Sequence, residues 1–376
     1  MRQRLLLALM LIGWFLAAPA EAFETAAKAA IIIDARTGVV LFEKNADQRL
    51  PPASMSKLMT AYMIFDRLKH GRLKLDDEIT ISEKAWKMGG SQMFLKVGDR
   101  VRVEDLIRGI IIMSGNDACV AMAEALAGSE EEFAREMTET ARRIGLTNST
   151  FANATGLDAP GHLMSVRDLA TLARTIITEF PEYFKYYSER EFVYRNIKQQ
   201  NRNPLIQANV PGADGMKTGY TEQSGYGLVG TAKRNDRRII VVLAGLESIN
   251  QRKTEGERLL EYGFREFQEY RLFQAGESVV DADVWLGAEA KVPLVPAKTV
   301  GVTLSHEARR GLSVKLRYGN PVPAPIEAGQ QLGSLEISAP NMTTFSVPLV
   351  AGKDVPRAGL LGRVTSMVGY YVWGAS

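Results

Sequence analysis

The period of the hydrophobic pattern changes near residue 277, and this change most constrains the fold. Before it, helical runs alternate with strands; after it, short alternating runs are separated by Gly, Pro and Asn. These runs cover residues 279–286, 300–304, 312–316, 331–337 and 343–349. Such alternation is typical of all-β sandwiches, and 376 residues are too many for a single core. We therefore expect two domains, at residues 23–275 and 276–352.

The first block contains a predicted antiparallel sheet assembled from both of its ends. Residues 29–33 and 39–42 are apolar runs around a turn, and residues 226–232 and 238–246 form a second pair around Asn235-Asp236. Predicted helices begin near Ser54 and after the capping residues Ser129 and Ser165, cover 107–112 and 117–127, and end with one from 255 to about 273. The expected fold is α+β, with a helical subdomain.

Both ends of the chain carry apolar segments. Residues 1–22 combine Arg2 and Arg4, an apolar stretch and a small-x-small site ending at Ala22, the pattern of a secretory signal. Residues 353–376 place apolar residues at helical spacing beside positive charges, which predicts an amphipathic helix lying in a membrane surface. The alternative for residues 1–22 is a membrane anchor that is not cleaved. The alternative for residues 353–376 is a helix docked on the protein's own core. We expect an exported, periplasmic protein, anchored peripherally to the outer face of the cytoplasmic membrane by the C-terminal helix.

Charge and composition exclude several function classes. Lys and Arg number 46 against 43 for Asp and Glu, without a basic block, so nucleic-acid binding is not expected. The three histidines and the single Cys119 form no cluster with metal-ligand spacing, so neither a metal nor another cofactor is expected. Cys119 falls in a helical pattern, which favours a buried small side chain over a reactive thiol.

The first candidate for catalysis is a Ser-x-x-Lys motif, formed by Ser54 and Lys57 directly after Pro51-Pro52. Residues three apart at a helix start share one face, so the two side chains lie within reach. The helix N-terminus favours negative charge on Ser54. Burial, and a second cation such as Lys217, would lower the pKa of Lys57 enough for it to act as the base that a serine needs. Read alone, the motif is more often a chance match.

The second motif, Ser114-Gly-Asn116, falls between two predicted helices. The Ser114 hydroxyl can relay a proton between the base and a leaving amine. The Asn116 amide can bind either a substrate carbonyl or the Lys57 side chain. Read by itself, this motif is better explained by helix capping.

The third motif, Lys217-Thr218-Gly219, leads into the hairpin, where an exposed strand can bind an extended substrate. Lys217 and Thr218 can hold a terminal carboxylate, and Gly219 removes a side chain that would block it. The backbone N–H groups of Ser54 and of one residue on this strand would form an oxyanion hole. A strand entry with a solvated lysine is the simpler interpretation of this motif alone.

Two arginines are further candidates for binding a carboxylate. Arg202 precedes the third motif, and Arg252 lies close to the start of the last predicted helix of the block. A guanidinium can bind a free C-terminus through two parallel hydrogen bonds. A plain surface charge is an equally good interpretation of each arginine.

Together these segments resemble the low-molecular-mass penicillin-binding proteins, the serine-type D-alanyl-D-alanine carboxypeptidase family. The resemblance rests on residues 44–60, 110–123 and 214–229 around the three motifs, on 156–158, 201–203 and 259–264, and on 324–326 and 347–351 of the second block. It implies a penicilloyl-serine-transferase fold, similar to that of β-lactamases, followed by a β-rich domain that holds the site off the membrane.

The resemblance also implies the reaction. Ser54 would attack the bond between the two terminal D-alanines of a peptidoglycan stem pentapeptide, releasing D-alanine, and water would hydrolyse the acyl-enzyme. β-Lactams would acylate the same serine as covalent inhibitors. By motif, Lys57 would be the base and Ser114 and Asn116 relay and positioning groups. Lys217, Thr218 and Gly219 would line the substrate strand, with Arg202 and Arg252 near its carboxylate end.

One departure and three alternatives remain. Many family members have His after Lys-Thr-Gly, where this chain has Tyr220, which bears on turnover rate and pH profile. A class A β-lactamase needs a Glu-x-x-x-Asn water-activating element, and none occurs between Gly145 and Asn201. An endopeptidase that cuts cross-links would use the same site, as would a weak β-lactamase. A catalytically idle wall-binding scaffold is the alternative of another class.

Overall fold

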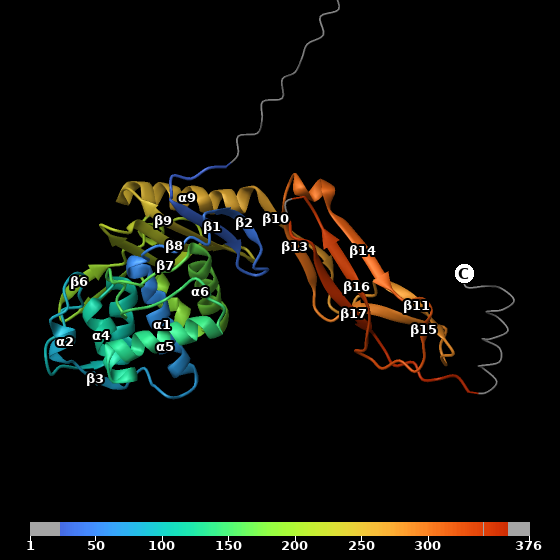
Figure 1. Ribbon diagram of the computed structural model, residues 1–376, viewed down its shortest axis with the longest axis horizontal. Coiled ribbons are helices and arrows are strands. Elements are labelled where there is room, and N and C mark those ends of the chain that lie inside the picture. Colours follow the sequence, from blue (N-terminus) through green and yellow to red (C-terminus); the bar gives the residue numbers. More distant parts are fainter. Residues whose placement is uncertain (1–22, 341, 360–376) are drawn as a thin grey trace, which may run out of the picture.

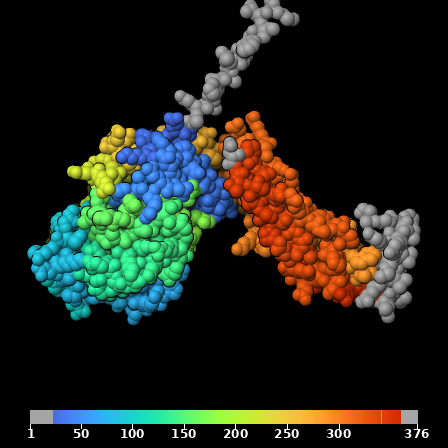
Figure 2. Space-filling view, in the orientation of Figure 1, coloured from blue at the N-terminus to red at the C-terminus, as the bar shows by residue number. Residues whose placement is uncertain are grey.

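The computed structural model describes residues 23–340 and 342–359, which form two lobes (Figure 1). The predicted signal at 1–22 and residues 360–376 of the predicted terminal helix lie outside the described residues. Figure 2 shows the two lobes in contact, and between them Arg36 forms an ion pair with Glu269 and the hydroxyls of Thr37 and Thr303 lie 3.4 Å apart.

The first lobe is organised around a five-stranded antiparallel sheet with the order β2-β1-β9-β8-β7. Its strands are β1 (Ala29–Asp34), β2 (Val40–Lys44), β7 (Ala213–Thr221), β8 (Gly225–Arg234) and β9 (Arg237–Leu246). The two hairpins predicted from sequence are confirmed. The strand β7 is the last in this sheet, so one of its edges lies beside the helical subdomain rather than another strand of the sheet.

Helices cover both faces of this sheet (Figure 1). One face packs on α9 (Ile249–Arg265) through Ile32, Leu228 and Leu259, and the other face packs on the helical subdomain. The short helix α8 (Pro204–Gln207) lies on the same face as α9, because Leu205 belongs to the same apolar cluster. The subdomain contains α1 (Lys57–Lys69), α2 (Glu83–Trp86), α3 (Val103–Arg108), α4 (Asn116–Ala127), α5 (Glu130–Arg143), α6 (Val166–Glu179) and α7 (Pro181–Phe184). Short turns η1 (Ala53–Ser56), η2 (Gly109–Met113) and η3 (Lys185–Ser188) and the ribbons β3 (Glu78–Thr80) with β4 (Arg100–Arg102) and β5 (Glu191–Tyr194) with β6 (Ile197–Gln200) complete it.

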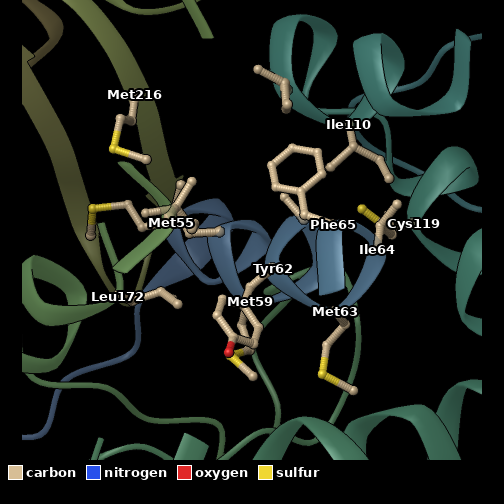
Figure 3. Close-up of a cluster of buried hydrophobic side chains, with 14 of the residues drawn as sticks. Met55, Met59, Tyr62, Met63, Ile64, Phe65, Ile110, Cys119, Leu172 and Met216 are labelled. Carbon is tan, nitrogen blue, oxygen red and sulfur yellow. The ribbon is translucent and has the colours of Figure 1, made fainter. Parts of the chain in front are cut away.

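The helix α1 lies at the centre of the subdomain core. Figure 3 shows Met59, Ile64 and Phe65 pointing in different directions from this helix into apolar surroundings. A helix that is apolar on nearly all sides is buried rather than amphipathic. Because α1 continues directly from η1, the packing of α1 fixes the position of the Ser54 turn. The capping serines predicted for α5 and α6 are also confirmed, since Ser129 and Ser165 accept hydrogen bonds from the N–H groups of Glu132 and Asp168.

The second lobe is built of β-strands. A six-stranded sheet, β14-β16-β17-β12-β11-β15, and the pair β10-β13 enclose one core that includes Leu294, Val302 and Leu335. The strands are β10 (Phe267–Phe273), β11 (Val280–Trp285), β12 (Lys291–Pro296), β13 (Val300–Ser305), β14 (Ser313–Tyr318), β15 (Val322–Pro323), β16 (Gln331–Ser338) and β17 (Phe345–Ala351), with one turn η4 (Ala308–Gly311). The predicted β-rich character is confirmed. The strand β12 escaped prediction because two prolines interrupt its pattern.

Two predicted boundaries are wrong. The helix expected to run to residue 273 ends at Arg265, and Phe267–Phe273 instead forms β10, which pairs with Val300–Ser305 of the second lobe. The boundary therefore precedes residue 267 rather than 276. The predicted terminal helix does not begin at residue 353, because residues 353–359 are not helical and Val355 pairs with Ile326. In the described part of the chain, no helix is long and apolar enough to cross a membrane.

Candidate active site

Ser54 lies in the 3-10 turn η1 rather than in the α-helix itself. A 3-10 turn places residues i and i+3 almost in line, and the Lys57 ammonium donates a hydrogen bond of 2.9 Å to the Ser54 hydroxyl. Ala53, which precedes Ser54, adopts the left-handed backbone with φ +48°. The structure thus brings the first motif together as a nucleophile and a candidate base.

Lys57 is buried, with 1% of its surface exposed. Its ammonium also donates to Asn116 Oδ1 at 2.8 Å and to the backbone carbonyl of Thr155. Burial, helped by the charge of Arg202 and opposed by Cys119, Asp117 and Glu130, lowers the pKa of Lys57 to about 8. At pH 7 about one Lys57 in ten is therefore neutral and able to accept a proton.

Ser114 and Asn116 of the second motif both reach this centre. Ser114 adopts a left-handed backbone (φ +61°) at the end of the π-helical turn η2 and accepts a 2.9 Å hydrogen bond from Lys217. π-turns inside helices often occur at functional sites. Asn116 Oδ1 accepts from Lys57, while its Nδ2 donates to the Gly89 carbonyl at 2.8 Å. Of the two partners considered for the Asn116 amide, the structure shows the lysine.

Lys217, Thr218 and Gly219 lie on the edge strand β7 beside the Ser54 turn. The pKa of Lys217 is lowered well below its usual value, first by burial and then by the charges of Lys57 and Arg202. A Cβ on Gly219 would lie 2.8 Å from the Pro52 carbonyl oxygen. The glycine therefore allows β7 to approach the nucleophile turn, a steric reason different from the substrate clearance expected from sequence.

Arg202 and Arg252 lie near Lys217 without a direct bond to Ser54. Arg202 donates to the Ser91 hydroxyl. Arg252 is only 8% exposed and lies over the Tyr226 ring, 5.5 Å from its centroid, and its buried Nε has no hydrogen-bond partner. Burial and the charge of Arg202 lower the pKa of Arg252.

The four cations Lys57, Lys217, Arg202 and Arg252 share one further property. Among residues 23–340 and 342–359, none of them forms an ion pair with a carboxylate. Lys57, Lys217 and Arg252 are buried, whereas Arg202 is exposed, and buried charges are normally paired. Such a cluster can bind a carboxylate-bearing substrate.

Tyr220 follows the third motif with half of its surface exposed, and its ring stacks on Tyr226 at a centroid distance of 4.2 Å. Tyr226 in turn lies against Arg252. The residue that departs from the family pattern therefore belongs to an aromatic layer over a buried arginine.

Two elements of the site were missed from sequence. The carboxylate of Asp117 accepts hydrogen bonds from the N–H groups of Met93 and Leu95, which holds that loop beside the site. The Thr155 carbonyl has no side-chain signal, although the neighbouring Gly156 does. A Cβ on Gly156 would lie 2.1 Å from the Ala53 carbonyl oxygen, so this loop approaches the Ser54 turn as β7 does.

Cys119 is fully buried behind the site, and burial raises its pKa to about 12. It therefore stays a neutral thiol, as the structural interpretation predicted.

A serine hydroxyl in contact with a buried lysine, a second lysine bonded to a second serine, and a sheet edge alongside define a serine acyl-transfer site on a penicilloyl-serine-transferase fold. Residues 16–248 match the family model described as D-alanyl-D-alanine carboxypeptidase, and residues 267–357 match the C-terminal domain of penicillin-binding protein 5. The chain belongs to the D-alanyl-D-alanine carboxypeptidase family.

Individual relatives agree with this assignment. The chain is 38% identical over 355 residues to the D-alanyl-D-alanine carboxypeptidase DacC of Escherichia coli, a match that covers 93% of this chain and 89% of that protein. The solved structure of penicillin binding protein 5 from Haemophilus influenzae is similar with a TM-score of 0.82 and 34% identity, covering 89% and 99% of the two chains. Ampicillin-bound penicillin-binding protein D2 from Listeria monocytogenes is similar with a TM-score of 0.60 and 29% identity, covering 65% and 99%.

Proposed function

We propose that this protein removes the terminal D-alanine from peptidoglycan stem pentapeptides through an acyl-enzyme on Ser54. The observation that carries the proposal is the 2.9 Å contact between Lys57 Nζ and Ser54 Oγ, in a buried place that lowers the pKa of Lys57 to about 8. A serine needs such a base to act as a nucleophile near neutral pH.

In the acylation step, Ser54 Oγ forms a bond to the carbonyl carbon of the penultimate D-alanine, and its proton passes to neutral Lys57. The backbone N–H of Ser54 and one N–H on β7 would stabilise the oxyanion. As the peptide bond breaks, the proton reaches the leaving amine through Ser114, which Lys217 holds at 2.9 Å. The leaving group is free D-alanine, whose amino group carries this proton.

Substrate binding follows from the edge strand and the cations. An extended peptide can align along the edge of β7 through backbone hydrogen bonds. Its free carboxylate would meet Thr218, Lys217 and the two arginines, and would supply the negative charge that this cluster lacks. A carboxylate at this place explains why the chain buries Arg252 without a partner for its Nε.

Deacylation requires water to attack the ester, with the amine of Lys57 again able to accept the proton. β-Lactams would acylate Ser54 in the same way, since they present an amide carbonyl and a carboxylate. The chain contains no Glu-x-x-x-Asn element between Gly145 and Asn201, so we propose that the β-lactam adduct is hydrolysed slowly.

The substrate comparison is a direct test. Purified protein is given a D-Ala-D-Ala tripeptide and a cephalosporin, and turnover of each is measured. The proposal requires faster turnover of the peptide; faster turnover of the cephalosporin would make the chain a β-lactamase. Cleavage of cross-linked dimers in preference to the pentapeptide would make it an endopeptidase. Failure of penicillin to add its mass to Ser54 would favour the idle scaffold.

We also propose that the enzyme is exported and works at the outer face of the cytoplasmic membrane. The support is the signal-like pattern at residues 1–22 and the amphipathic pattern of the C-terminal segment. The β-rich second lobe then lies between the catalytic lobe and that segment in the chain.

A further inference from the structure

The backbone carbonyl of Thr155 accepts a hydrogen bond from the Lys57 ammonium, so the loop that carries it helps to aim the base. The loop has no regular secondary structure and is shaped by side chains. Asn153 Oδ1 accepts from the N–H groups of Thr155 at 3.1 Å and Gly156 at 2.7 Å, which closes a tight turn. Thr60 on α1 donates to the Ala154 carbonyl at 2.7 Å.

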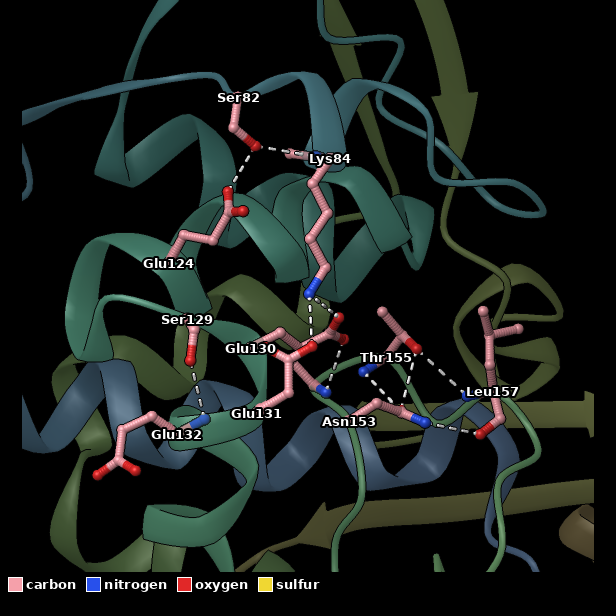
Figure 4. A network of polar contacts seen from close by, with 12 residues as sticks. Ser82, Lys84, Glu124, Ser129, Glu130, Glu131, Glu132, Asn153, Thr155 and Leu157 are labelled. Atoms are coloured by element: carbon pink, nitrogen blue, oxygen red, sulfur yellow. Dashed lines mark hydrogen bonds and ion pairs between the residues drawn. The ribbon is translucent and has the colours of Figure 1, made fainter.

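The Ala154 N–H of this turn donates to the carboxylate of Glu130 at 3.2 Å. Glu130 is the first residue of α5 and is 8% exposed, a rare position for a carboxylate. Figure 4 shows Glu130 between Lys84 and the loop of Asn153 and Thr155. Lys84 Nζ lies 3.3 Å from the other oxygen of the same carboxylate.

Lys84 is itself held in place. It lies on the short helix α2, which is capped by Ser82, and the Ser82 hydroxyl donates to Glu124 on α4 at 2.6 Å. The ammonium of Lys84 is shared with Glu131 at 2.9 Å, and the Glu131 side chain is 76% exposed. The two neighbouring glutamates therefore share a cation, but only Glu130 reaches the loop.

We propose that Glu130 is a positioning residue for catalysis: it holds the Asn153–Ala154 peptide, and with it the loop whose Thr155 carbonyl keeps Lys57 aimed at Ser54, with Lys84 balancing its buried charge. The inference rests on the proposed role of Lys57 as the base. A buried carboxylate bonded to one backbone N–H and one ammonium is fixed in orientation, and the residue that it holds, Ala154, directly precedes Thr155, whose carbonyl contacts the base.

Charge and positioning can be separated, because Glu130 also acts on Lys57 through space. The charged or titratable groups that act on Lys57 are Cys119 and Asp117 on α4, Arg202, Lys217 on β7 and Glu130 itself. Removing the negative charge of Glu130 lowers the pKa of Lys57, so the acylation rate begins to fall at a lower pH. Loss of positioning instead lowers the maximum acylation rate that is reached at high pH.

The test measures acylation of the full chain by a chromogenic cephalosporin, as a rate constant at saturation and an apparent binding constant, per folded site and across pH. Glu130→Ala should lower the saturating rate by about 10- to 100-fold, as small misplacements of catalytic groups do, with binding changed less than about twofold. Glu130→Gln retains an acceptor for the Ala154 N–H and should stay within about threefold of wild type, with the acidic limb at lower pH.

Glu131→Gln is the matched control, since it also loses a contact with Lys84, and its rate should equal that of wild type. Asn153→Ala opens the same turn from its other side and should reproduce the slow rate of Glu130→Ala; it carries the test if Glu130→Ala does not fold. A wild-type rate in Glu130→Ala would overturn the proposal, as would a wild-type rate in Asn153→Ala if that variant is used in its place. Equal losses of rate in Glu130→Gln and Glu130→Ala would also overturn it. A wild type that is never acylated would instead refute the proposed function.

Discussion

Lys57 Nζ lies 2.9 Å from Ser54 Oγ across one turn of 3-10 helix, and the same nitrogen bonds Asn116 on another helix and the carbonyl of Thr155 on a loop. Three segments distant in sequence thus converge on one amine. The hydroxyl and the amine belong to residues three apart in the chain, but the low pKa of the amine depends on the burial that the other segments provide.

The pH dependence of acylation follows from this burial. Neutral Lys57 is the reactive form and its pKa is lowered to about 8, so the rate should rise roughly tenfold per pH unit up to about pH 8 and then level off. Stopped-flow acylation by a β-lactam between pH 5.5 and 9.5 measures this limb, with thermal melts at each pH as the control for folding. A limb near pH 10.5, the ordinary lysine value, would show that Lys57 is not the base.

Gly219 should tolerate no side chain. A Cβ there would lie 2.8 Å from the Pro52 carbonyl oxygen, so Gly219→Ala must push β7 away from the Ser54 turn at a cost of about 1–3 kcal/mol. We expect a lower melting temperature and acylation slowed more than the folded fraction explains. Gly319→Ala is the control, because nothing lies within 4 Å of a Cβ at that glycine. Equal behaviour of the two variants would refute the close approach.

Arg252 should contribute affinity for a free C-terminus. Arg252→Gln removes a buried cation whose Nε has no partner, so KM for a peptide acid should rise about tenfold, while kcat changes little. The preference for the acid over the C-terminal amide should fall by the same factor. Arg258→Gln on the same helix is the control, because Arg258 is paired with Glu255 away from the cluster. An unchanged preference in Arg252→Gln would remove this arginine from the site.

Two truncations separate membrane attachment from folding. Deleting residues 360–376 should release the protein from membranes and leave peptidase activity and melting temperature unchanged. Deleting residues 353–376 should also destabilise the second lobe, because Val355 is fully buried and pairs with Ile326. Membrane flotation and calorimetry measure the two effects. Continued flotation of the shorter deletion would contradict the anchor.

The sequence predicted the parts of the fold that local pattern controls. Apolar alternation around Asn235-Asp236 predicted the β8–β9 hairpin, and Ser129 and Ser165 predicted two helix starts. The prediction from sequence failed where contacts with distant segments decide the secondary structure. Phe267–Phe273 follows a helix with aromatic residues that suit either structure, and only pairing with Val300–Ser305 makes it a strand.

The candidate site divides in the same way. Ser54, Ser114 and Lys217 stand in motifs whose residue types suggest chemistry. The Thr155 carbonyl, Glu130 and Asp117 could not be found from pattern, because a backbone acceptor carries no residue signature and a carboxylate at a helix start is ordinary capping. The steric need for glycine at position 219 could not be predicted from sequence either. It comes from the carbonyl of Pro52, which lies more than 160 residues earlier in the chain.

The most direct measurement is release of D-alanine from a stem pentapeptide by the wild type and by Ser54→Ala. Removing the hydroxyl leaves Lys57 and the substrate strand in place, so the variant should fold and bind the peptide. The account predicts stoichiometric D-alanine from the wild type and none above the uncatalysed background from Ser54→Ala. Release by the variant at a comparable rate, or none by the wild type, would contradict it.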